Sequence, residues 1–168
     1  VLVQQDIIGT KTEVVSGASV TAKYIENAFV SAKENVFVGV SFINGTIMAG
    51  GSTVVKEPGI INGGRISCKG SLYAKRIGGN WSTPTEIFLG DDPFLMKRKE
   101  EARKMIQTLQ HREVELEKSL VSAKNNNANS SEIINEQKRV SVSLTRFRTY
   151  EKKLEEKIYG KPFRRKKK

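Results

Sequence analysis

The sequence predicts a mainly β fold joined to α structure: a parallel, right-handed β-helix (a β-solenoid) followed by a protruding antiparallel coiled-coil helical hairpin. An apolar row recurs every 16 to 19 residues between residues 14 and 78, and a seven-residue period replaces it after Pro93. Composition changes at the same place, because residues 1–93 hold 13 of the 14 glycines and the net charge of +11 falls on residues 94–168. We therefore expect a β-solenoid over residues 1–90 with a C-terminal capping strand, a hairpin over residues 91–159 and a basic tail over residues 160–168.

The solenoid prediction depends on four segments that align on shared inward positions. The aligned rows are Val14, Val30, Ile47, Ile66; Ser16, Ala32, Ala49, Cys68; Val20, Val36, Thr53, Leu72; and Ala22, Val38, Val55, Ala74. Alternating inward residues are typical of strands, and the step suits one coil of a solenoid. One coil cannot bury its apolar row alone, so the coils must stack. The many glycines between the rows disfavour a helical repeat.

One corner of each coil carries asparagine, at Asn27, Asn44 and Asn62. A left-handed backbone or a ladder of asparagine side chains favours this residue there.

The segments on either side of the repeat extend the prediction. Residues 1–13 resemble the end of a preceding coil, with Ile8-Gly9-Thr10 matching Asn44-Gly45-Thr46, so we expect the chain to be part of a longer protein. Beyond the repeat, the stretch with the single tryptophan, Trp81, and a short strand over residues 86–89 should form a non-repeating cap over the solenoid end, where unpaired backbone groups would invite aggregation.

A helix should begin at Asp92-Pro93, because aspartate caps free N–H groups and proline suits the first helical position. Heptad-spaced apolar residues then predict two helices joined by a polar loop over residues 125–131, and therefore an antiparallel hairpin. The expected coiled-coil seam is Leu95, Ala102, Ile106, Leu109, Leu116, Leu120, Ile133, Val140, Leu144, Phe147, Leu154 and Ile158. Lys99 and Glu113 interrupt the seam of the first helix, and polar Glu113, Gln137 and Glu151 are expected to set its register.

Two basic clusters are candidate binding surfaces. The tail residues Lys161, Arg164, Arg165, Lys166, Lys167 and Lys168 would attract nucleic acid phosphates or an anionic surface. A solubilising tail or a cloning remnant is the alternative. The cluster Lys97, Arg98, Lys99, Arg103 and Lys104 is interspersed with glutamates, so we expect a solvated helix face held by pairs four residues apart.

Signatures of catalysis are missing from the sequence, and we expect no enzyme, catalytic residue, metal or cofactor. His111 is the single histidine, and the single cysteine, Cys68, occupies an inward solenoid position. Catalysis and metal binding both require several converging side chains. The pairs Gly50-Gly51 and Gly63-Gly64 do not open a helix, so corner geometry explains them better than phosphate binding. No apolar run is long enough to span a membrane, and the buried cysteine suits a reduced, cytosolic protein.

The order of the segments resembles a known family. The segment GGRISCKGSLYAKRIG, the junction from Thr85 to Asp92-Pro93 and the immediate passage into a charged hairpin are similar to the bacterial flagellar assembly protein A (FapA) family. The resemblance covers about residues 7–159. It implies a cytoplasmic bacterial protein with a parallel β-helix and a coiled coil, linked in some members to the placement or assembly of polar flagella.

Together these observations predict a non-enzymatic, FapA-like scaffold that binds a protein partner through its hairpin and is recruited to the cell pole. Two alternatives stay open: a nucleic-acid-binding module that uses the basic tail, and a homo-oligomer that polymerises through the β-helix.

Overall fold

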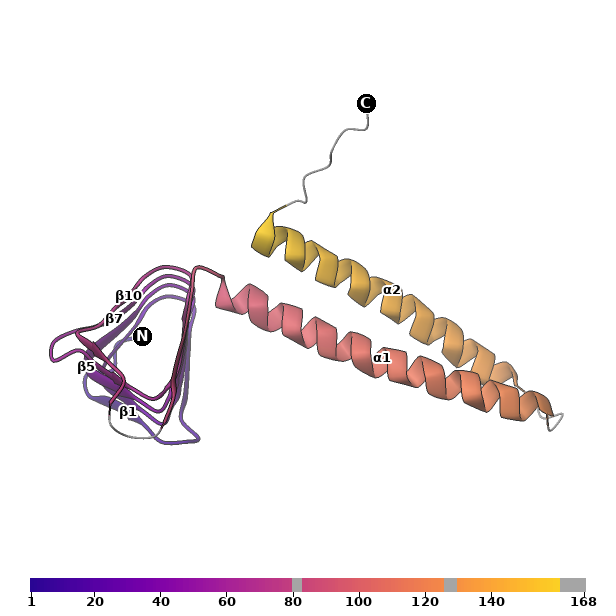
Figure 1. Ribbon diagram of the computed structural model, residues 1–168, viewed down its shortest axis with the longest axis horizontal. Helices are drawn as coiled ribbons and strands as arrows, with labels where there is room; N and C mark the ends of the chain where they lie inside the picture. The colour runs from indigo at the N-terminus through magenta and orange to yellow at the C-terminus, as the bar shows by residue number, and fades with distance from the viewer. Residues whose placement is uncertain (80–82, 126–129, 161–168) are drawn as a thin grey trace, which may run out of the picture. The chain divides into compact units, whose positions relative to one another are not determined.

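The computed structural model describes residues 1–79, 83–125 and 130–160. The chain divides into two compact units, Val1–Phe94 and Leu95–Lys168, and each is considered by itself. The first is a parallel β-solenoid of about five turns, and the second contains two helices packed as a hairpin (Figure 1). These findings confirm the predicted fold class.

The solenoid consists of two parallel sheets whose strands stack coil upon coil (Figure 1). The first sheet runs in the order β1-β3-β5-β7-β10, with β8 paired to β5 and β11 paired to β8. The second runs in the order β12-β9-β6-β4-β2. The strands of the first sheet are β1 (Asp6–Ile8), β3 (Val20–Glu26), β5 (Val36–Ile43), β7 (Thr53–Val55), β8 (Ile60–Asn62), β10 (Leu72–Tyr73) and β11 (Arg76–Ile77). Those of the second are β2 (Glu13–Ser16), β4 (Phe29–Ala32), β6 (Thr46–Ala49), β9 (Gly64–Cys68) and β12 (Thr85–Leu89).

The strand register confirms the alignment of the repeat. In the second sheet, Val14, Val30, Ile47 and Ile66 are successive partners, as are Ser16, Ala32, Ala49 and Cys68. In the first sheet the same holds for Val20, Val36, Thr53 and Leu72. Because every second side chain points inward, these rows form the core of the solenoid. Its largest fully buried side chains are Phe42, Ile25, Ile47, Ile61 and Ile66.

The asparagine corner is correct for two coils and wrong for the third. Asn27 and Asn44 have positive φ angles of 51° and 49°. However, Asn62 pairs with Ile43, the residue before Asn44. The corner position of this coil is therefore taken by Gly63, which has a φ angle of 70°. A side chain at Gly63 would be strained by the positive φ angle, and its Cβ would also meet the side chains of Asn44 and Thr83, so this corner favours glycine.

Two further expectations about the solenoid are wrong. Ile8 pairs with Glu26, which in turn pairs with Ile43. Gly9 is therefore equivalent to Asn27 and Asn44 of the next coils, and not to Gly45 as expected. The stretch expected to be non-repeating contains a further rung of the repeat at the end of the second sheet, because β12 pairs in parallel with β9 over five residues, from Thr85 opposite Gly64 to Leu89 opposite Cys68. Trp81, the other part of the expected cap, lies outside the described residues.

Helix α1 (Pro93–Asn125) begins two residues before the second unit and continues into it, and helix α2 (Ser131–Tyr159) lies wholly within that unit. Asp92 caps α1 as predicted: its carboxylate accepts a 3.0 Å hydrogen bond from the backbone N–H of Phe94. Most of the loop predicted over residues 125–131, residues 126–129, lies outside the described residues.

Candidate functional site

The hairpin is held together by an apolar seam between its helices. Ile106, Leu116, Val140 and Leu144 form one buried cluster, with Leu109, Ile133 and Phe147 packed against it. Ala102 and Leu154 are also buried, whereas Leu95, Leu120 and Ile158 are half-buried. This seam joins two long helices into one body.

Lys99 is a buried cation in the seam, with only 6% of its surface exposed. Its ammonium group lies 2.9 Å from a carboxylate oxygen of Glu155 and 4.8 Å from the centre of the Tyr159 ring. The hydrogen bond from Lys99 holds the pKa of Glu155 below its ordinary value. A buried ammonium needs such partners, because burial disfavours an unpaired charge. The expectation of a solvated face is therefore wrong for Lys99.

Further ion pairs cross the hairpin with the same polarity. Arg103 of α1 binds Glu151 at 2.7 Å and Glu155 at 3.4 Å. Nearer the loop, Arg112 binds Glu136 at 2.8 Å. Each of these pairs joins a cation of α1 to a glutamate of α2, whereas Lys104–Glu100 follows the expected spacing of four residues within one helix. Sequence reasoning missed the cross-helix pairs, although the opposite charges beside both seams were a signal for them.

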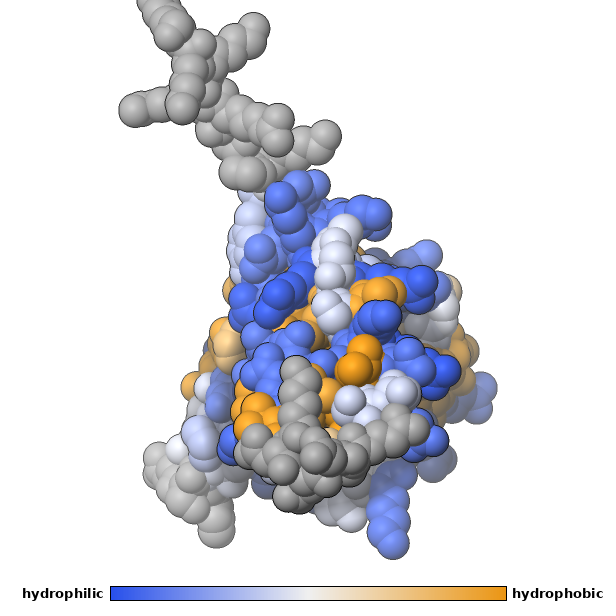
Figure 2. All heavy atoms as spheres, turned by 90° about the vertical axis from the view of Figure 1, so that its right-hand side faces the viewer, coloured by the Kyte–Doolittle hydropathy of each residue, from blue (hydrophilic) through white to orange (hydrophobic). Residues whose placement is uncertain are grey.

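The cross-helix pairs leave a row of basic and aromatic side chains on α2. This row, which we call the α2 basic face, consists of the basic residues Arg139, Arg146, Lys153 and Lys157, the aromatic Tyr150 and the polar Ser143. Tyr150 is 43% exposed. Three shallow hollows meet at Tyr150, and Arg146 or Lys153 lines each of them. Figure 2, which looks at the hairpin from its loop end, shows hydrophilic side chains surrounding scattered hydrophobic ones.

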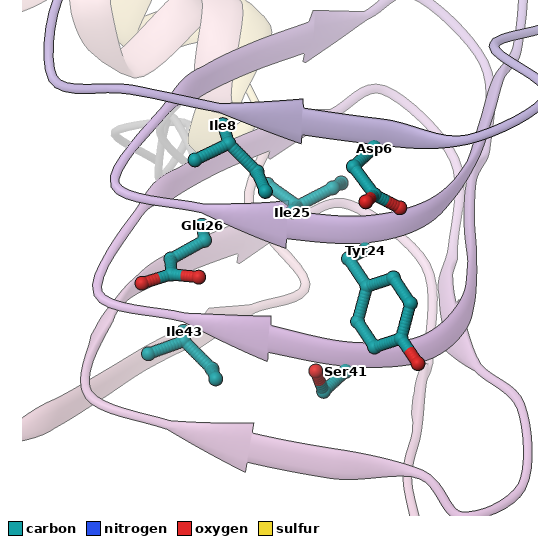
Figure 3. Close-up of a pocket in the computed structure, with 7 residues that line it drawn as sticks. All are labelled: Asp6, Ile8, Tyr24, Ile25, Glu26, Ser41 and Ile43. Carbon is teal, nitrogen blue, oxygen red and sulfur yellow. The ribbon is translucent and has the colours of Figure 1, made fainter.

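A groove on the outer surface of the solenoid is the other concave feature. Two columns of side chains line it, one through Asp6, Tyr24 and Ser41 and the other through Ile8, Glu26 and Ile43 (Figure 3). The columns follow the register of β1, β3 and β5, and Ile25 points into the core between them. Within the described part of the chain the Asp6 carboxylate has no hydrogen-bond or ion-pair partner, and Figure 3 shows no nucleophile and base directed at each other.

The candidate reactive groups of the chain do not converge. The side chain of His111 is 79% exposed and lies 3.4 Å from Glu115 of the same helix. Cys68 is a free, fully buried thiol, and burial raises its pKa. Within residues 1–79, 83–125 and 130–160, no three His, Cys, Asp or Glu side chains gather closely enough to hold a metal ion.

The basic tail of Lys161, Arg164, Arg165, Lys166, Lys167 and Lys168 lies outside the described residues. Among the helices that the structure describes, none combines the length and apolarity needed to cross a membrane.

The solenoid and both helices fall within a match to one known protein family. Residues 1–162 match the family described as the Flagellar Assembly Protein A beta solenoid domain. Comparison with curated proteins and with solved structures gave no match. The family match covers the solenoid and both helices, and the structure has the solenoid that the family description names. The chain therefore belongs to the Flagellar Assembly Protein A beta solenoid domain family.

Proposed function

We propose that this protein is a non-enzymatic scaffold in flagellar assembly or its regulation, and that its helical hairpin binds a protein partner. The family supports the flagellar role. We further propose that the scaffold acts in the bacterial cytoplasm and is recruited to the cell pole.

The observation that carries this proposal is the construction of the hairpin. Its seam and its cross-helix ion pairs use the inner faces of both helices. The outer faces are thereby left to solvent over helices of 33 and 29 residues. An exposed surface of that length, on a packed pair of helices, offers a partner many contacts without requiring the hairpin to unfold.

The proposal is tested in the bacterium that carries the gene, by replacing residues 95–159 with a short glycine-serine linker. We expect cells with this variant to lose flagella or to place them wrongly, counted by electron microscopy. Protection of Cys68 from thiol reagents would show that the solenoid of the variant is folded. Normal flagella with a folded solenoid would contradict the role of the hairpin.

A second candidate function is self-association through the solenoid edges. β12 has one strand neighbour among the described strands, β9, and exposes Phe88 and Leu89. An unpaired edge with apolar side chains favours pairing with another chain. Light scattering at increasing protein concentration tests this candidate, and a constant monomer mass would exclude it.

The basic tail stays a proposed anion-binding segment on the strength of its sequence. A gel-shift titration with and without residues 161–168 tests it, and equal affinity for nucleic acid at low salt would remove the tail from consideration.

A further inference from the structure

We infer that the α2 basic face binds an acidic amphipathic helix of a partner protein. This inference rests on the proposed function, because it names the class of partner that the hairpin would bind.

The α2 basic face is one continuous stripe. Its six residues are spaced 4-3-4-3-4 along α2, so they lie on one side of the helix. From Arg139 to Lys157 the stripe extends about 27 Å, at 1.5 Å per residue. Arg139, Arg146 and Lys153 recur every seventh residue, or about every 10.5 Å. A second helix laid along α2 could present side chains at the same interval.

The charges of this stripe are available to a partner. Three glutamates of α2, Glu136, Glu151 and Glu155, bind cations of α1. By contrast, no salt bridge within the described part of the chain involves Arg146, Lys153 or Lys157. The hairpin therefore uses three of the five glutamates of α2 internally and presents the basic residues of the stripe outward.

Apolar contact is available between the charges. Phe147 and Leu154 belong to the seam, yet each also lines a hollow on the surface. Tyr150 lines all three hollows. Glu156 is the one carboxylate that lines them, at the end near Lys157. Cationic side chains thus surround small openings with apolar or aromatic walls.

This combination favours an acidic amphipathic helix over a nucleic acid backbone. Such a helix carries carboxylates and apolar side chains on neighbouring faces, which match the cations and the hollows together. A phosphate backbone satisfies the cations but has no aliphatic side chains to fill the hollows. Electrostatic complementarity would orient the partner, and the hollows would make its binding less sensitive to salt.

The test uses the full chain and a fluorescein-labelled helical peptide of about 18 residues, which spans the stripe. Glutamates occupy one face of the peptide and leucines the neighbouring face. Comparison probes are a shuffled peptide of the same composition and a DNA duplex of about the same length. The charge-reversal variant is Arg146→Glu/Lys153→Glu. Its matched control, Lys69→Glu/Lys118→Glu, makes the same change of charge at two lysines that do not belong to the stripe.

Fluorescence anisotropy should show that the patterned peptide binds more tightly than both other probes. Each reversal replaces an exposed attraction with a repulsion, so the charge-reversal variant should bind about tenfold more weakly, while the control variant should bind within about twofold of the unaltered chain. Tyr150→Ala should weaken binding at high salt as well as at low salt. Equal loss in the control variant, equal binding of the shuffled peptide, or tighter binding of the DNA would overturn the inference.

Circular dichroism of each variant checks that the hairpin remains helical. The same charge reversal in cells separates this inference from the proposed function. If linker replacement of the hairpin abolishes flagella while the charge reversal leaves them normal, the scaffold function stands and the α2 basic face is not its binding site.

Discussion

Alanine substitutions at Leu144 and Val142 should have very different effects on the stability of the hairpin. Leu144 is 3% exposed and lies in the seam cluster, whereas Val142, two residues away on the same helix, is 52% exposed. Leu144→Ala removes three buried carbon groups worth about 0.8 kcal/mol each, and a cavity adds to the loss, so the hairpin should lose about 3 kcal/mol. Val142→Ala removes little buried surface and improves helix propensity, so it should be neutral or stabilise the hairpin by up to about 0.5 kcal/mol.

Urea unfolding followed by circular dichroism at 222 nm measures this difference, because the helices dominate that signal. With a slope of about 1 kcal/mol per molar urea, Leu144→Ala should lower the midpoint by about 3 M, or abolish the helical signal if the hairpin is less stable than that. Cys68 protection reports separately on the solenoid, which should be unchanged in both variants. Equal effects of the two substitutions would refute the seam as the source of stability.

Three further predictions concern the solenoid and the charged pairs. Gly64→Ala should destabilise the solenoid by about 1–3 kcal/mol, because Gly64 has φ 81° and a Cβ would lie 2.7 Å from the backbone nitrogen of Gly45. The control Gly17→Ala, where a Cβ meets no atom within 4 Å, should have little effect. The rate at which a thiol reagent labels Cys68 measures the stability of both variants. The raised pKa of Cys68 means that the unfolded chain loses its thiol proton first, so stability should fall as pH rises above about 9.0, more steeply than in Cys68→Ala, as measured by thermal melts. The lowered pKa of Glu155 gives the reverse dependence: hairpin stability should fall as pH drops below about 4.5, and Glu155→Gln should lessen that fall in acid titrations followed at 222 nm.

Much of the fold follows from periodicity that can be read along the chain. The alternation around Val30 and Val36 identifies inward positions, and the step between equivalent residues sets how one coil stacks on the next. The heptads of α1 and α2, with a short polar link between them, predict a hairpin for the same reason. Such patterns can be recognised without knowing which segments lie nearby in the fold, because the period of a strand or helix fixes which of its residues share one face.

The candidate site was harder to predict, because its properties depend on residues far apart in the chain. Lys99 is buried by partners more than 50 residues away, Glu155 and Tyr159. The heptads place Lys99 on the seam row, but they do not show which residues of α2 pair with its charge. The availability of Lys153 and Lys157 is similarly a result of which glutamates α1 engages.

The sequence by itself determined the solenoid, the alignment of its inward rows and the presence of two heptad helices, because hydrophobic period and glycine content are local properties of the chain. Only the tertiary structure decided that Gly63 takes the corner in place of Asn62, that β12 continues the stack, and that α1 cations bind α2 glutamates. These outcomes depend on the space that one coil leaves for the next and on the antiparallel register of the helices, and both arise only when distant segments come together.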